Sequence, residues 1–236
     1  MLKRYVSTLL AVVCGLLHGV VDVSAQTPGT VKVEFERVVV TESAVDSTRG
    51  TIYFRAPART VVTVTYPVNQ WMVFDRAAML IYYPDESRAF RFTSDNPFTL
   101  PFFQAFLALA KDDLSLLESG FTLRDSEIRG DTLLTRWNPP AAAKKQVGLA
   151  LVRHVENRLV AMEVHDTNGK AISRTTYGNH LEYHGMYFPL EIVSEYLLEQ
   201  SRENVIYHHP QFDSKLPAKI IDFQLPADVD LKIVEW

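Results

Sequence analysis

Cysteine is almost absent from this chain of 236 residues, which contains only Cys14. No disulfide can join two parts of the chain, and beyond Cys14 no thiol is available as a nucleophile or metal ligand. An excess of positive charge is also absent, since 24 basic and 28 acidic residues give a formal net charge of −4. The composition therefore gives no electrostatic reason to expect a nucleic-acid partner, and we predict none.

Motifs for catalysis and metal binding are lacking too. The sequence has no Gly-x-Ser-x-Gly nucleophile elbow and no glycine-rich phosphate loop. His180 and His184 stand four residues apart, about 13 Å on a strand, and the adjacent His208 and His209 would point to opposite faces of one. A zinc site needs about three or four converging ligands. We therefore predict no metal, no cofactor and no enzymatic activity.

The first 25 residues have the pattern of a secretory signal peptide. Lys3 and Arg4 are followed by an apolar stretch over residues 6–21 and by the small-residue cleavage site Val23-Ser24-Ala25. Export without disulfides is typical of a bacterial periplasm, which is the predicted location. Residues 26–236 are predicted to form a single domain.

Two alternatives remain for the N-terminus. The apolar stretch could be retained as a membrane anchor, although it is shorter than the ~20 residues that span a bilayer. Cys14 could be lipidated, although the preceding residues 10–13 lack the small residue expected directly before such a cysteine.

The stretch from Arg49 to Thr93 contains five short apolar or alternating runs separated by turn residues. Period-two alternation of β-branched and aromatic residues is typical of strands, with alternate side chains on one face. Five sequential strands with short turns predict an antiparallel meander that has one face rich in large apolar groups.

This stretch resembles the LolA family of periplasmic lipoprotein carriers and the broader group of lipoprotein-sorting proteins. The motifs that carry the resemblance are a glycine opening a strand, a basic-Pro element, a hairpin ending in aromatic-x-Pro, and a closing F-x-x-P-x-x-V. They correspond here to residues 50–54, 55–57, 75–84 and 223–229. In the family an arginine directly before the proline latches a lid. That position is Ala56 here, so the latch is either absent or moved to Arg59.

Residues 100–109 are apolar nearly all round and predict a buried helix, while most of the remaining chain reads as further strands. The predicted fold is mainly β with one helical insertion. About ten antiparallel strands would form a strongly curved sheet, or incomplete β-barrel, covered by the short apolar helix. The resemblance implies the same LolA-like fold.

The resemblance also implies a function: a monomeric periplasmic carrier that binds the acyl chains of lipoproteins or lipids in the half-barrel. Cargo would pass from an inner-membrane transporter to an outer-membrane acceptor. The implied cavity residues are Ile52, Phe54, Val62, Val64, Tyr66, Trp71, Val73, Leu80, Tyr82, Phe90 and Phe92, and the implied lid residues are Phe102, Phe103, Phe106 and Leu107.

Three other interpretations remain. The apolar face could be an ordinary filled core that binds nothing. The protein could be a periplasmic sensor or scaffold on the same fold, with no transport role. A lipid hydrolase would need a nucleophile with a partnered base, and no candidate for either stands out in the sequence.

Overall fold

The computed structural model describes residues 28–57, 59–75, 78–93, 116–117 and 119–235. Within them, fourteen strands form one sheet in the order β14-β6-β5-β4-β3-β2-β1-β13-β12-β11-β10-β9-β8-β7. The strands are β1 (Thr30–Val40), β2 (Val45–Arg55), β3 (Arg59–Tyr66), β4 (Gln70–Asp75), β5 (Ala78–Tyr83), β6 (Arg88–Thr93), β7 (Thr122–Arg129), β8 (Thr132–Asn138), β9 (Leu149–Val155), β10 (Arg158–His165), β11 (Ala171–Tyr183), β12 (Met186–Tyr196), β13 (Ser201–Phe212) and β14 (Asp230–Glu235).

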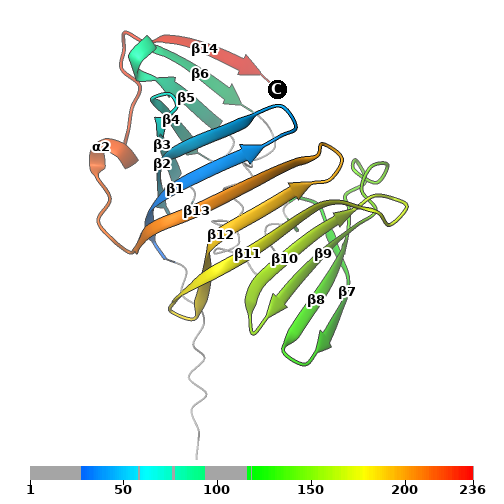
Figure 1. The fold of residues 1–236 in the computed structure, drawn as a ribbon. Helices are drawn as coiled ribbons and strands as arrows, with labels where there is room; N and C mark the ends of the chain where they lie inside the picture. Colours follow the sequence, from blue (N-terminus) through cyan, green and yellow to red (C-terminus); the bar gives the residue numbers. More distant parts are fainter. Residues whose placement is uncertain (1–27, 58, 76–77, 94–115, 118, 236) are drawn as a thin grey trace, which may run out of the picture.

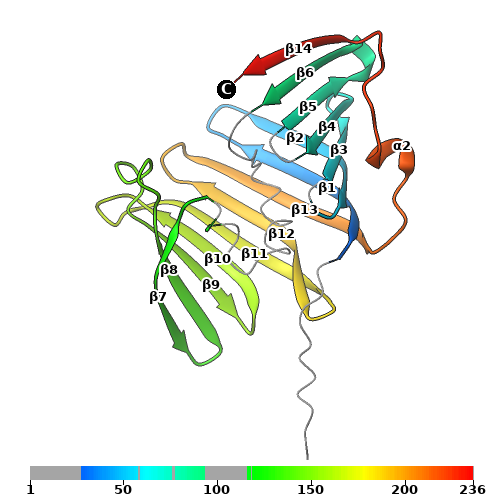
Figure 2. The same ribbon diagram turned by 180° about the vertical axis from the view of Figure 1, so that it is seen from behind.

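Two antiparallel meanders, β1 to β6 and β7 to β13, meet where β1 pairs with β13, and β14 adds a parallel strand beside β6. The sheet is bent, and its ends β14 and β7 do not meet (Figures 1 and 2). The predicted meander over residues 49–93 is confirmed, because β2 to β6 are neighbours in sequence order. The mainly β, curved and incompletely closed fold is confirmed as well.

Three details of the fold differ from the prediction. The described sheet has more strands than the ten or so expected. β11 runs unbroken from Ala171 to Tyr183, whereas the sequence pattern predicted two separate strands at residues 171–177 and 181–183. β14 was not predicted at all, and it pairs parallel with β6, which is distant in sequence.

Helices are short in the described residues: a 3₁₀ turn at Pro84–Glu86 and α2 at Ala218–Ile221. No helix in the described ranges is long and apolar enough to cross a membrane. The predicted apolar helix at 100–109, its lid residues Phe102, Phe103, Phe106 and Leu107, and the signal peptide all lie outside the described residues.

Two strands approach each other closely at Gly50 on β2. A Cβ there would lie 2.1 Å from the carbonyl oxygen of Thr63 on β3 and 2.9 Å from the Phe35 ring. The pairing of β2 with β3 also shifts at this point, because Gly50 pairs with Val64 whereas Arg49 pairs with Tyr66. Thr65 is thus an extra residue, a β-bulge, and the close contact beside it leaves no room for a side chain at residue 50.

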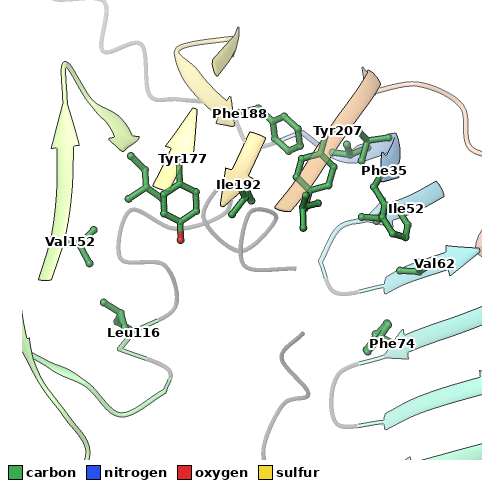
Figure 3. Packing of buried hydrophobic residues seen from close by; sticks show 14 of the residues in the cluster. Phe35, Ile52, Val62, Phe74, Leu116, Val152, Tyr177, Phe188, Ile192 and Tyr207 are labelled. Carbon is green, nitrogen blue, oxygen red and sulfur yellow. The ribbon is translucent and has the colours of Figure 1, made fainter. Parts of the chain in front are cut away.

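The two faces of the sheet bury two separate apolar clusters. We call the face that carries the larger cluster the inner face. Strands β1–β4 and β8–β13 contribute to it, with Val33, Ile52, Val62 and Phe188 fully buried. Figure 3 shows Val152 on one side and Val62 and Phe74 on the other, all pointing into the same interior. The smaller cluster lies on the outer face, where α2 packs against β2 and β3 (Figure 1).

Candidate ligand-binding face

Six of the predicted cavity residues lie on the inner face. Ile52, Phe54, Val62 and Val64 belong to the larger cluster or pack against it. Phe90 and Phe92 on β6 stand opposite Ile81 and Met79 on β5, and Met79 packs against the same cluster.

These six residues differ in their exposure. Ile52, Val62 and Val64 are buried in the sheet centre, whereas Phe90 and Phe92 are only partly buried. The inner face thus becomes more accessible toward β6. A ligand on this face would make its contacts most readily at that end.

The prediction is wrong for four residues on β4 and β5. Val73 and Leu80, which pair with each other, belong to the outer cluster. The rings of Trp71 and Tyr82 lie 4.9 and 5.6 Å from the ring of Phe223, which follows α2. Both faces of these strands are apolar because the C-terminal segment covers the outer one.

Tyr66 is misplaced by the prediction for a different reason. The bulge at Thr65 shifts the register by one residue, which sends the next side chain to the opposite face. Tyr66 therefore stands beside Arg49, whose guanidinium carbon lies 5.8 Å from the ring centroid, and it is 53% exposed. Alternation alone could not reveal this shift.

Sequence reasoning missed the inner-face residues of β4 and β5, which are Met72, Phe74, Met79 and Ile81. They are as apolar as their neighbours on the outer face, so no compositional signal separates the two sets. These residues can be assigned to the inner face only from their pairing with a neighbouring strand, such as β3, whose inner-face residues are already known.

Arg59, considered above as a relocated lid latch, fastens the C-terminal segment instead. Its side chain donates hydrogen bonds to the carbonyl oxygens of Ile221 (2.7 Å) and Phe223 (3.0 Å), and it lies 3.3 Å from Asp75. Arg55 pairs nearby with Asp222 at 2.8 Å. Both arginines thus hold the segment that covers the outer face.

Polar side chains interrupt the inner face on β11, β12, β13 and β1. Glu203 is 4% exposed; one of its carboxylate oxygens lies 2.5 Å from Nε of Arg37 and the other accepts from the Tyr196 hydroxyl at 3.3 Å. Ser194, which pairs with Glu203, stands 3.1 Å from the hydroxyl of Thr175. This polar row crosses the sheet within an otherwise apolar surface.

Three buried or half-buried tyrosines lie on β11, β12 and β13, the strands that carry most of this row. Burial raises the pKa of Tyr177, and the nearby Tyr196 adds to the shift. Burial, followed by the negative charge of Glu203, raises the pKa of both Tyr196 and Tyr207. These phenols therefore remain protonated, and each can act as a hydrogen-bond donor at physiological pH.

His180 and His184, which stand four residues apart in the sequence, make contacts of other kinds. A ring nitrogen of His180 lies 2.8 Å from the carbonyl oxygen of Leu159, and burial lowers the pKa of His180. His184 occupies a turn with positive φ, where its ring contacts Tyr183. Among the described residues no group of three or more potential metal ligands occurs.

A shallow hollow of about 620 Å³ lies away from the predicted site, between the start of β7, the connection over residues 138–148 and Thr167. Its lining includes one charged side chain, Lys144, and no residue that the sequence pointed to. It shows no convergence of chemically reactive groups.

Solved structures with this fold come from several bacteria. A LolA superfamily protein from Nitrosomonas europaea covers 84% of this chain and 93% of its own, at 16% identity and a TM-score of 0.57. A domain described as an outer membrane lipoprotein-sorting protein, from Vibrio parahaemolyticus, covers 80% and 87%, at 13% identity and a TM-score of 0.60. A DUF1329 family protein from Desulfovibrio piger covers 83% and 90%, at 14% identity and a TM-score of 0.59.

No family model and no curated protein matches the chain. At 13–16% identity, the likeness shows the fold alone. The chain therefore has the fold of LolA superfamily and lipoprotein-sorting proteins, as the resemblance in residues 50–84 predicted.

Proposed function

We propose that this protein is a periplasmic carrier that holds the acyl chains of lipoproteins or lipids against the inner face of the sheet and ferries them toward the outer membrane. The observation that carries the proposal is the inner face itself, an apolar surface to which both meanders contribute (Figure 3). The shared fold with a lipoprotein-sorting domain supports it.

Physical chemistry makes such a surface sufficient for binding. Each methylene group of an acyl chain gains about 0.8 kcal/mol when it leaves water, so a chain of ordinary length can offset the entropy lost on association. Few hydrogen bonds and little shape specificity are then required. We accordingly infer a binding role rather than a catalytic one. An inner-membrane donor and an outer-membrane acceptor would exchange the cargo with a monomeric carrier.

Neighbouring residues on β5 provide a matched test. Met79 and Leu80 are both partly buried, but Met79 packs against the inner cluster and Leu80 against the outer one. We would purify residues 26–236 and the variants Met79→Gln and Leu80→Gln from a periplasm without detergent. Native mass spectrometry would then measure the bound lipid or acylated polypeptide.

The carrier proposal expects ligand on the wild type and on Leu80→Gln, and markedly less on Met79→Gln. Circular dichroism would verify that both variants are folded. A wild type that carries nothing and takes up neither added lipoprotein nor phospholipid would overturn the proposal. The inner face would then be ordinary core, and a scaffold with a protein partner would be the better interpretation.

A further inference from the structure

One polar group on the inner face has no role within the fold. Tyr177 on β11 is 4% exposed, and its hydroxyl oxygen has no hydrogen-bond partner among the residues the structure describes. Figure 3 shows this oxygen pointing away from the strand. A buried hydroxyl without a partner destabilises a protein, and phenylalanine would fill the same space without that cost.

The neighbouring polar groups satisfy one another and leave Tyr177 out. Glu203 is shared between Arg37 and Tyr196, and Ser194 is bonded to Thr175. The charge of Arg37 is matched by the carboxylate 2.5 Å away. Among the described residues, this part of the inner face therefore presents an uncommitted neutral donor, and the positive charge of Arg37 is already compensated.

The surroundings of Tyr177 are otherwise apolar. Its pairing partner on β12 is Ile192, and both belong to the inner cluster together with Val152 of β9. A molecule that reaches the hydroxyl must therefore be mainly aliphatic, with an acceptor oxygen at the end of its apolar part. An acyl ester or amide has this structure.

We propose that Tyr177 is a specificity-determining residue that donates a hydrogen bond to the neutral carbonyl oxygen of an acyl ester or amide. This inference rests on the proposed acyl-binding function and refines it by ligand class. Free fatty-acid anions are disfavoured, because their carboxylate would be buried among apolar side chains of the inner cluster while Arg37 is already paired with Glu203.

Two lipids that differ in one carbonyl group test the inference. Monopalmitoylglycerol has an ester carbonyl, and hexadecylglycerol has an ether in its place. Displacement of the fluorescent probe N-phenyl-1-naphthylamine would measure the affinity of the wild type and of Tyr177→Phe for each lipid. Tyr66→Phe, which alters an exposed hydroxyl on the outer face, serves as the control variant.

We expect the wild type and Tyr66→Phe to bind the ester about fivefold more tightly than the ether, which corresponds to one hydrogen bond of about 1 kcal/mol. Tyr177→Phe should bind both lipids with the affinity that the wild type has for the ether. Equal affinities in the wild type, or an equal loss for both lipids in Tyr177→Phe, would overturn the carbonyl subsite while the carrier function stands. Failure of both lipids to bind to any of the proteins would overturn the carrier function as well.

Discussion

Tyr177→Phe should make the ligand-free protein more stable, which is unusual for a substitution inside a core. The ring is 4% exposed, so phenylalanine would occupy the same site with the same contacts. The hydroxyl has lost its water and gained no described partner, which costs about 1–3 kcal/mol. Removing it should therefore raise the free energy of unfolding by about 1–2 kcal/mol.

Urea unfolding of delipidated protein, followed by tryptophan fluorescence, measures this effect. With a urea dependence of about 2–3 kcal/mol per molar for a chain of this size, the midpoint should rise by about 0.5 M. Adding monopalmitoylglycerol should reduce or reverse the difference, because the proposed hydrogen bond then stabilises only the tyrosine form.

Tyr196→Phe removes the same atom from a neighbouring tyrosine and should have the opposite effect. Its hydroxyl donates to Glu203, which is 4% exposed, so the variant leaves a buried carboxylate with one donor fewer. The expected loss of stability is about 1–3 kcal/mol. If Tyr177→Phe were destabilising to a similar degree, the Tyr177 hydroxyl would have a partner in the folded protein, and the carbonyl subsite would lose its basis.

Three further predictions concern the sheet, the C-terminal segment and export. Gly50→Ala should destabilise the protein by about 2 kcal/mol or more in urea unfolding, because the new Cβ would meet the Thr63 carbonyl at 2.1 Å. Arg59→Ala should lower the free energy of unfolding by about 1–3 kcal/mol and expose the C-terminal segment to limited proteolysis. Arg55→Ala breaks an exposed ion pair and should lower it by less than about 1 kcal/mol. Equal losses in the two variants would argue against the fastening role of Arg59. Edman sequencing of the exported protein should begin at Gln26, and an intact N-terminus would contradict the signal-peptide prediction.

The existence of most strands could be read from the sequence, because alternation and turn residues act over short distances. Gly50, which was expected to open a strand, lies instead in the middle of β2, where two strands approach each other closely. β14 escaped prediction because its pairing with β6 joins segments more than a hundred residues apart. Such a pairing leaves no local pattern in either segment.

The sequence predicted only in part which side chains lie on the inner face of the sheet. On β2 and β3, alternation with threonine and arginine correctly assigned Ile52, Val62 and Val64 to one face. Residues 71–74 of β4 and 78–83 of β5 are apolar or aromatic at every position, so the same rule had nothing to distinguish Val73 from Met72. The outer face there is apolar because a distant segment, residues 216–223, packs on it.

The amino-acid sequence by itself determined the class of the fold, because residues that alternate in polarity form strands wherever they stand in the chain. It determined, too, that the chain carries no disulfide. Tertiary structure decided which face each bulky residue occupies, since a single bulge at Thr65 or a covering segment changes the outcome. It also decided that the buried Tyr177 hydroxyl has no hydrogen-bond partner among the described residues, because a hydrogen bond depends on which strands become neighbours.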